Sequence, residues 1–332
     1  MMPSISVIIP TYNRYASVER ILHALARQTL APENYEVIVS IDGSQDGTRQ
    51  LVASFSAPYH LNHTWQENQG RAAACNAGIR MAQADILVIL DDDMEPAPDC
   101  LERHAHAHPT GSRLGVMGAV PMAGESTDPQ IASYIAAKFN RHLDNLAQPD
   151  HQLALRDFYS GHFSIRRDVL MEVGLFDEAF RIYGNEDLEL SLRLAKAGVR
   201  LLYDPATIAY QHYSKDFAAL GHDTVAKGRT AVLLASKHPE ALPDLQLSAY
   251  QQESWRWRAA RAWLLAISRW FPSTQDRIIA LVERLELRQA RQLHLYYRFV
   301  LDYLYWLGVK KALRENRQTG RGLTSLVHRR VT

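Results

Sequence analysis

The chain carries the run Ile86-Leu87-Val88-Ile89-Leu90-Asp91-Asp92-Asp93, in which five apolar residues are followed directly by three carboxylates. A short, unbroken apolar run is typical of a strand that is buried on both faces of a sheet. Alternate side chains of an extended chain point the same way, so Asp91 and Asp93 are expected to converge on one site. Their oxygens suit Mg²⁺ or Mn²⁺ shared with a diphosphate. A solvated acidic loop is the alternative interpretation.

Strand and helix patterns alternate through the first hundred residues. Apolar strands are expected at 4–9, 35–41 and, more weakly, 59–64, with helices around 18–25, from 46, and over 71–82. This order predicts an α/β fold with a mostly parallel sheet covered by helices on both faces. Ligands of such sheets bind beyond the carboxyl ends of the strands, which are here 10–14, 42–44 and 91–93.

The second half of the chain changes character twice. Residues 114–212 mix strands at 116–120, 158–165 and 207–211 with helices at 131–146 and 188–197, and the remainder is almost wholly helical. We therefore expect a catalytic domain over 1–213, with a nucleotide-binding half (1–110) and an acceptor and base half (111–213). A helical C-terminal region over 214–332 follows it.

Composition indicates a folded protein of a reducing compartment. Hydrophobic residues make up 47% and charged residues 22% of the 332 residues, and the two cysteines, Cys75 and Cys100, form no CxxC pair. This argues against a disulfide framework or a zinc site. A strand pattern that begins at Ile5 leaves no room for a signal peptide, and no apolar stretch reaches the ~20 residues that span a bilayer. We expect a cytoplasmic protein, and a peripheral position at the inner face of the membrane is a second expectation.

The net charge of +1 hides an uneven distribution. Residues 251–332 hold 14 Arg and 2 Lys against 6 acidic residues, a net charge of +10, and mix arginine with aromatic residues, as in Trp255-Arg256-Trp257-Arg258. Two interpretations stay open: this region packs on the catalytic domain or on a second subunit of a homo-oligomer, or it docks on an anionic membrane surface beside a lipid-linked acceptor. An acidic body without a known nucleic-acid motif argues against a nucleic-acid partner.

Other polar residues stand at the predicted ligand edge. Asp42 follows an apolar strand and can accept a hydrogen bond from a nucleobase, although Asp-Gly is also common in turns. Arg71 opens a helix and offers a fork to phosphate, although it is equally an ordinary surface arginine. Asp187 follows Asn185 and Glu186 at a helix start, where capping and a general base are both plausible.

A lone histidine is more often a packed or surface residue than a metal ligand. His212 follows a predicted strand and becomes a metal or phosphate ligand only if it faces Asp93. His104, His106 and His108 are interpreted as surface residues, because only His104 and His108 share a helix face.

Taken together, these segments resemble glycosyltransferase family 2, inverting enzymes with a GT-A fold. The resemblance spans about residues 4–213. It rests on Ser6–Arg14, Ser40–Thr48, Glu67–Gly70 with Asn76–Gly78, Leu90–Asp93, Val173–Glu178 and Gly184–Leu194 in that order. The fold implied is a Rossmann-like, mostly parallel mixed sheet flanked by helices, here with a helical C-terminal extension.

The resemblance also implies a role for each matching residue. The metal ligands implied are Asp93, Asp91 and His212, with Mn²⁺ or Mg²⁺ as the cofactor, and the catalytic base is Asp187 with Glu186 beside it. The nucleotide-binding residues implied are Pro10, Thr11, Tyr12, Arg14, Asp42, Arg71, Asp91 and Asp92. The acceptor-side residues are His162, Gly161 and Asn185.

Two positions depart from the family pattern. Ile41 stands where a first aspartate is frequent, while Asp42 keeps the second. Gly161-His162 stands where Gly-Asn is frequent, which leaves the acceptor open.

The implied reaction is an inverting transfer of a sugar from a nucleotide-diphosphate sugar, with UDP expected, to an acceptor hydroxyl in cell-surface polysaccharide or glycolipid synthesis. A nucleotidyltransferase is one alternative, although Pro10–Arg14 is not the Gly-rich basic loop that it requires. The other is a catalytically silent nucleotide-sugar-binding partner protein, against which the intact acidic sites argue.

Overall fold

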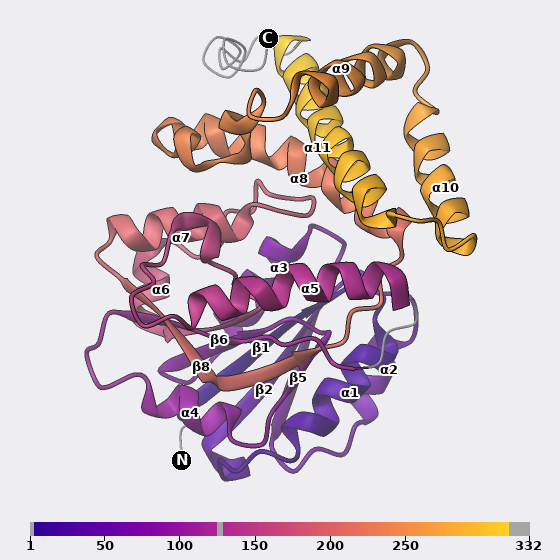
Figure 1. The fold of residues 1–332 in the computed structure, drawn as a ribbon. Coiled ribbons are helices and arrows are strands. Elements are labelled where there is room, and N and C mark those ends of the chain that lie inside the picture. The colour runs from indigo at the N-terminus through magenta and orange to yellow at the C-terminus, as the bar shows by residue number, and fades with distance from the viewer. Residues whose placement is uncertain (1–2, 125–128, 319–332) are drawn as a thin grey trace. The chain divides into compact units, whose positions relative to one another are not determined.

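The computed structural model describes residues 3–124 and 129–318 (Figure 1). The chain forms two compact units. Of the described residues, the first unit comprises 3–124, 135–181 and 186–213, and the second comprises 129–134, 182–185 and 214–318.

The first unit is built on an eight-stranded sheet of order β3-β2-β1-β4-β7-β6-β8-β5. Strands β1 to β4 are parallel, β7 runs antiparallel between β4 and β6, and β8 is parallel to β6 but antiparallel to β5. The predicted mostly parallel mixed sheet is thus confirmed. The strands are β1 Ile5–Thr11, β2 Tyr35–Asp42, β3 His60–Gln66, β4 Ile86–Leu90, β5 Met94–Pro96, β6 Leu114–Ala119, β7 His162–Arg166 and β8 Arg200–Gln211.

Helices cover both faces of this sheet. Ile5, Val7 and Ile9 of β1 belong to one buried apolar cluster, and Ile8 of the same strand belongs to another. Since neighbouring side chains of a strand point to opposite faces, each face has its own core. The helices are α1 Tyr15–Leu25, α2 Thr48–Ser54, α3 Arg71–Met81, α4 Cys100–His106, α5 Pro129–Leu146, α6 Arg167–Val173 and α7 Glu186–Lys196, with short 3₁₀ helices Pro32–Asn34 and Leu155–Asp157.

Three element boundaries differ from expectation. The strand expected at 158–165 begins only at His162 and ends at Arg166, and a 3₁₀ turn over 155–157 precedes it. The strand expected at 207–211 is the end of the longer β8, whose pairing with β6 is interrupted by an irregularity at Gly118 and Ala119. Helix α7 begins at Glu186 rather than at residue 188, and both acidic residues lie in its first turn, as the helix start expected at Asn185–Asp187 predicted.

The second unit is helical, as expected for the C-terminal region. It contains α8 Phe217–Lys237, α9 Trp255–Trp270, α10 Thr274–Leu287 and α11 Leu293–Gln318, with 3₁₀ helices at Pro239–Asp244 and Gln246–Ala249. Glycines let α8 and α11 touch backbone to backbone, since a Cβ on Gly228 would lie 2.0 Å from the Tyr305 carbonyl oxygen. Among the described residues, no helix has the length and apolar character that crossing a membrane requires.

Candidate active site

The carboxyl ends of β1, β2 and β4 bring the predicted nucleotide-binding residues to one edge of the sheet. Because Ile8 pairs with Ile89, Thr11 lies beside the aspartates that follow β4. The Thr11 hydroxyl donates to Asp92 Oδ2 at 2.7 Å. Pro10 is buried in the strand, whereas Tyr12 is 51% exposed above it.

Asp42 is buried at the end of β2 and organises the loop before α3. Its carboxylate accepts hydrogen bonds from Gln66 Nε2 at 2.8 Å, from the Gln69 amide at 2.9 Å and from the Gly70 amide at 2.8 Å. A carboxylate has about four lone-pair sites, so a nucleobase N–H would share it with these three donors. The nucleobase role stays a prediction, and positioning α3 is a function the structure gives this side chain.

Arg71, the first residue of α3, joins residues that are far apart in the chain. Its Nε and Nη2 lie 2.9 Å and 2.7 Å from Asp91 Oδ1. Its Nη1 lies 3.3 Å from Asp187 Oδ1 and 3.8 Å from Glu186 Oε1. The carboxylates raise the pKa of Arg71, against the opposing effect of burial. The structure therefore brings Asp91, Glu186 and Asp187 around one guanidinium.

Ser160, which lies two residues before the start of β7, also belongs to this cluster. Strand β7 is antiparallel to β4, so its beginning lies at the edge where β4 ends, with Leu90 opposite His162. The Ser160 hydroxyl donates to Asp187 Oδ1 and accepts from Arg71 Nη1 at 2.9 Å. The sequence analysis missed Ser160, although it directly precedes the Gly161-His162 pair.

Gly161 lies against the aspartates rather than in an open acceptor surface. Its carbonyl accepts from the Asp91 amide at 2.9 Å, and a Cβ here would lie 2.4 Å from Asp91 Oδ2. Only a residue without a side chain leaves the Asp91 carboxylate in its place.

The two acidic residues of α7 have different surroundings. The Glu186 side chain is almost fully buried, and burial, followed by the negative charge of Asp187, raises its pKa to about 7, with Arg71 opposing the shift. The Asp187 side chain is 28% exposed. A group that must meet an acceptor hydroxyl needs access, so the geometry is consistent with Asp187 as the base.

Asp93 and His212, two of the three residues proposed for metal binding, are adjacent where β5 pairs with β8. The Asp93 carbonyl accepts from the His212 amide at 2.9 Å, and Gln211 Nε2 donates to Asp93 Oδ2 at 3.2 Å. The His212 ring Nε2 lies 2.7 Å from Glu95 Oε2, which leaves Nδ1 as its other ligand atom. A carboxylate partner on the far ring nitrogen is the usual arrangement for metal-binding histidines. Glu95 is thus a second residue that the sequence analysis missed.

The donor set fits a hard divalent ion. Burial raises the pKa of Asp92 to about 7, with the charges of Asp93 and Asp91 adding to the rise and the Thr11 hydrogen bond and Arg14 opposing it. A cation beside these carboxylates would relieve that crowding. In the described part of the chain, Asp91, Asp93 and His212 do not form a closed three-ligand cluster. An open site completed by diphosphate oxygens therefore fits better than an all-protein cage.

The structure corrects the acceptor role of His162. Its ring is wholly buried, with Nδ1 3.2 Å from the Ala119 carbonyl oxygen and Nε2 3.0 Å from His104 Nε2. Cys100 Sγ lies 3.4 Å from the same Nε2. A side chain enclosed in this way does not reach an acceptor, so the prediction was wrong.

The surface interpretation of the neighbouring histidines is corrected as well. His104 and His108 are buried and both bond the Ser164 hydroxyl, at 2.7 Å and 2.8 Å, whereas His106 is exposed as expected. Burial lowers the pKa of His104 and takes that of His108 to about 4. The tertiary contact with β7 fixes these rings as neutral core residues.

The acceptor role of Asn185 stays a prediction, with its amide nitrogen excluded from that role. Its buried amide nitrogen donates to the Lys227 carbonyl at 2.9 Å and to Thr230 Oγ1 at 2.8 Å, inside the helical unit. The amide nitrogen is fully used there, which contradicts an acceptor contact through it.

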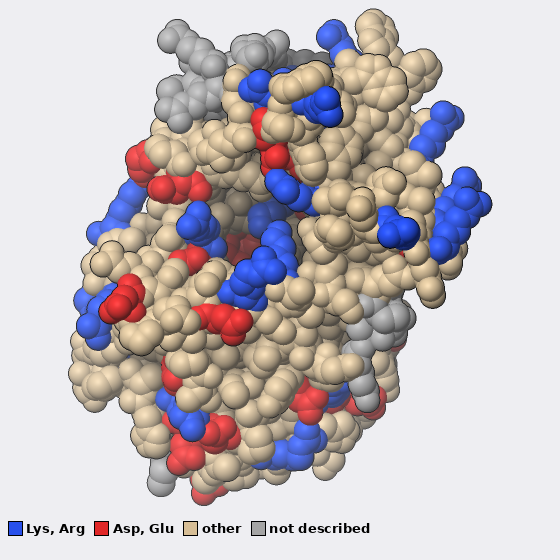
Figure 2. Space-filling view, viewed as in Figure 1, with Lys and Arg blue, Asp and Glu red and all other residues tan. Residues whose placement is uncertain are grey.

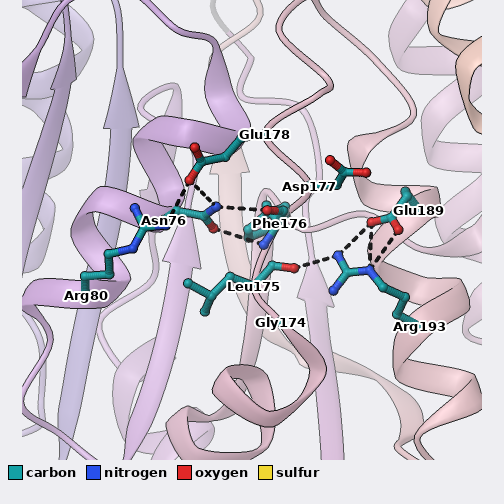
Figure 3. Close-up of a pocket in the computed structure, with 9 residues that line it drawn as sticks. All are labelled: Asn76, Arg80, Gly174, Leu175, Phe176, Asp177, Glu178, Glu189 and Arg193. Atoms are coloured by element: carbon teal, nitrogen blue, oxygen red, sulfur yellow. Dashed lines mark hydrogen bonds and ion pairs between the residues drawn. The ribbon is translucent and has the colours of Figure 1, made fainter.

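The segment Val173–Glu178 contacts the Arg71 cluster through Phe176. Most of this segment lines a surface hollow of about 450 Å³ (Figure 3). Asn76 exchanges two hydrogen bonds of 2.9 Å with the backbone of Phe176. Arg193 donates to the Leu175 carbonyl at 2.6 Å and pairs with Glu189. These bonds hold the Phe176 ring 5.8 Å from the Arg71 guanidinium. None of the predicted site residues lines the hollow.

Comparisons with known proteins bear on the family and the fold of the chain. The model of the family described as glycosyl transferase family 2 matches residues 6–174, and one described as glycosyltransferase like family 2 matches residues 137–255. A validoxylamine A glucosyltransferase of Streptomyces hygroscopicus subsp. limoneus is 30% identical over 74% of the chain and 59% of its own length. The glycosyltransferase AglE of Haloferax volcanii is 30% identical over 61% of the chain and 64% of its own length. The chain thus spans less than two thirds of these relatives.

Solved structures share the fold. A mannosyltransferase of Pyrobaculum calidifontis in complex with GDP-Man and Mn²⁺ has a TM-score of 0.59 and 22% identity over 95% of this chain and 88% of its own. S. aureus TarS in complex with UDP-GlcNAc has a TM-score of 0.53 and 15% identity over 96% of this chain and 92% of its own. The expected GT-A type of fold is confirmed. With a family model matched over half of its length, the chain belongs to glycosyl transferase family 2.

Proposed function

We propose that this protein is an inverting glycosyltransferase that moves a sugar from a nucleotide-diphosphate sugar, with UDP as the expected nucleotide, to an acceptor hydroxyl. The observation that carries the proposal is the Arg71 cluster, in which one guanidinium contacts both Asp91, at the donor edge of the sheet, and Asp187, at the start of α7. A donor phosphate and an acceptor base must meet in this way for transfer to occur.

Each residue of the cluster has a role in a single displacement. The acceptor oxygen forms a bond to the anomeric carbon while the bond from that carbon to the phosphate oxygen breaks, and the electron pair leaves with the nucleoside diphosphate. Asp187 takes the proton of the acceptor hydroxyl, and Ser160 fixes the orientation of this carboxylate. Arg71, whose guanidinium is paired with Asp91 and Asp187, supplies positive charge beside the departing phosphate. Since no covalent sugar–enzyme intermediate forms, the anomeric configuration inverts.

A divalent ion is part of the proposal. Asp93, Asp91 and His212 would hold Mn²⁺ or Mg²⁺, which would supply positive charge to the diphosphate. Support comes from the Pyrobaculum mannosyltransferase, whose structure contains GDP-Man and Mn²⁺, and from TarS, whose structure contains UDP-GlcNAc.

The acceptor is proposed by class only. A hydroxyl of a growing cell-surface polysaccharide or glycolipid is consistent with relatives named chondroitin synthase and dolichol-phosphate mannosyltransferase. The catalytically silent partner protein remains the alternative, and turnover of a donor sugar distinguishes the two.

The decisive experiment replaces the base. Nucleotide sugars are first screened by thermal shift with Mn²⁺, and release of nucleoside diphosphate from the best donor is then measured. Asp187→Asn keeps the size of the side chain but removes the proton acceptor, so we expect kcat to fall by about 10²–10⁴-fold. The product anomer, read by proton NMR, should be inverted relative to the donor.

The matched control is Asp168→Asn, an exposed carboxylate paired with Arg166 that lies outside the cluster. Its turnover should equal that of the wild type. Wild-type turnover in Asp187→Asn would remove the base assignment, and a retained anomer would exclude the single displacement.

A further inference from the structure

Helix α9 of the helical unit buries one of its arginines and exposes three of its tryptophans. Arg261 is 1% exposed, whereas Trp255, Trp263 and Trp270 are 68%, 65% and 74% exposed. A surface helix of a folded domain normally shows the reverse arrangement, with polar residues outward and apolar residues inward.

The buried side of α9 is fixed by one carboxylate of α11. Arg261 Nη1 pairs with Asp302 Oδ2 at 3.0 Å, and Trp257 Nε1 donates to the same oxygen at 2.7 Å. The Arg261 guanidinium also lies 4.2 Å from the centre of the Tyr250 ring. Because these bonds set the rotation of α9 about its axis, the outward position of the three tryptophans is part of the fold.

The outward face is continuous. At 100° per residue, Trp255, Trp263 and Trp270 lie within about a quarter of a turn of one another. Exposed alanines fill the spaces between them, and exposed arginines border the face on both sides; these residues are Ala259, Ala262, Ala266, Arg256 and Arg269. The sequence of α9 contains no Asp or Glu. Figure 2 likewise shows Lys and Arg side chains over the region of α9 and α10, with few Asp or Glu beside them.

Charge decides between the occupants of this face. In a symmetric contact between two copies, each face meets its own equivalent, so the bordering arginines would approach one another with no acidic residue of α9 between them. An anionic lipid surface offers the opposite charge to the arginines and an interfacial environment that suits tryptophan. Sixteen residues, four of them arginine, are too short and too charged to cross a bilayer, so the helix would lie in the plane of the surface.

We propose that the Trp255–Trp263–Trp270 face of α9 docks the protein on an anionic membrane surface. The sequence left open whether the aromatic residues of the C-terminal region pack within the protein or face a membrane. In the structure, some of them are buried and others are exposed. Tyr297, Tyr303, Tyr305 and Trp306 are buried within the helical unit, and the three α9 tryptophans are left for a partner. Only the corollary, that the acceptor is lipid-linked, rests on the function proposed above.

The test is flotation of the full chain with vesicles. Vesicles of phosphatidylcholine mixed with an equal part of phosphatidylglycerol are compared with vesicles of phosphatidylcholine alone, at low and high salt. We expect binding to the anionic vesicles, weakened by salt. Replacing Trp255, Trp263 and Trp270 together by alanine should lower the partition coefficient by at least about tenfold. In Arg256→Glu/Arg269→Glu, the preference for anionic vesicles should disappear.

The control is Trp65→Ala, which removes a tryptophan exposed on β3 and should leave vesicle binding unchanged. Far-UV circular dichroism confirms that each variant is folded, and donor hydrolysis without vesicles separates a failure of docking from a failure of the transfer chemistry. No binding of the wild type to anionic vesicles would overturn the proposal. Undiminished binding by both variants, or light scattering that shows self-association lost with the tryptophans, would overturn it as well.

Discussion

Two arginines of this protein are placed among carboxylates, and they differ in how their charge is matched. Arg261 of the helical unit is enclosed with one carboxylate, Asp302, whose oxygens also accept from the indoles of Trp257 and Trp306. Arg71 of the sheet unit faces three carboxylates, those of Asp91, Glu186 and Asp187.

The number of carboxylates around each arginine distinguishes a structural ion pair, at Arg261, from a candidate catalytic site, at Arg71. In the Arg261 pair, one positive charge meets one negative charge, and Nη1 and Nη2 of the guanidinium donate to Asp302 and to the Tyr250 carbonyl, so no further ion is needed. The Arg71 cluster carries an excess of negative charge at a partly open sheet edge, which favours the arrival of a cation or a proton. Mutations should therefore affect the stability of the fold at Arg261 and catalysis at Arg71.

The largest effect is expected from Asp302→Ala. This change leaves Arg261 buried without its counter-ion, and breaking a buried pair by removing one partner costs about 3–5 kcal/mol. Urea unfolding followed by circular dichroism measures the loss. The control is Glu253→Ala, which removes the partner of the largely exposed Arg298 and should cost no more than about 1 kcal/mol. Equal losses in the two variants would contradict the balanced-pair interpretation.

The second prediction concerns Arg71→Lys, which keeps the charge but removes the fork. A single ammonium does not contact Asp91, Ser160 and Asp187 together, so we expect kcat/KM to fall by about a hundredfold with little change in the urea midpoint. Arg80→Lys on the same helix, where the arginine is exposed and pairs with Glu178, is the matched control and should behave as the wild type. A stability loss without a kinetic loss would make Arg71 a structural residue like Arg261.

The sequence predicted these two regions unequally. Continuous apolar strands that end in aspartates placed Asp91 at a sheet edge, and the acidic start of α7 identified Asp187. Ser160 was missed because its partners, Arg71 and Asp187, lie on α3 and α7, far away in the chain. Glu95 was missed because its partner, His212, follows β8, which is antiparallel to β5, and no local pattern encodes this pairing. The burial of His104 and His162 depends on the contact of α4 with β7. In α9, arginine and tryptophan each fit either side of the helix, so only the bond to Asp302 decides which faces outward.

The smallest expected effect tests the excess charge of the Arg71 cluster through Glu186. Burial raises its pKa from 4.5 to about 7, so the folded state holds a proton that the unfolded state releases in this range. The contribution of this proton to the stability of the wild type is complete at pH values below the pKa of Glu186 in the unfolded state. It is lost as pH rises through the pKa of Glu186 in the folded state. Glu186→Gln cannot ionise, so its stability relative to the wild type should rise by at least about 1 kcal/mol between about pH 5 and about pH 8.

The comparison variant for this experiment replaces Glu178, a glutamate whose pKa is lowered rather than raised by the fold. A hydrogen bond from Asn76, followed by one from Arg80, lowers the pKa of Glu178, so Glu178→Gln should lose stability relative to the wild type only where Glu178 is ionised. Its deficit therefore disappears as pH falls below the ordinary range of a glutamate, and it does not change between neutral and alkaline pH. The contrary result would be that the stability of Glu186→Gln relative to the wild type does not change between neutral and alkaline pH. Glu186 would then be ionised across that range, and the carboxylates around Arg71 would be balanced by charges of the fold, as Asp302 is balanced by Arg261.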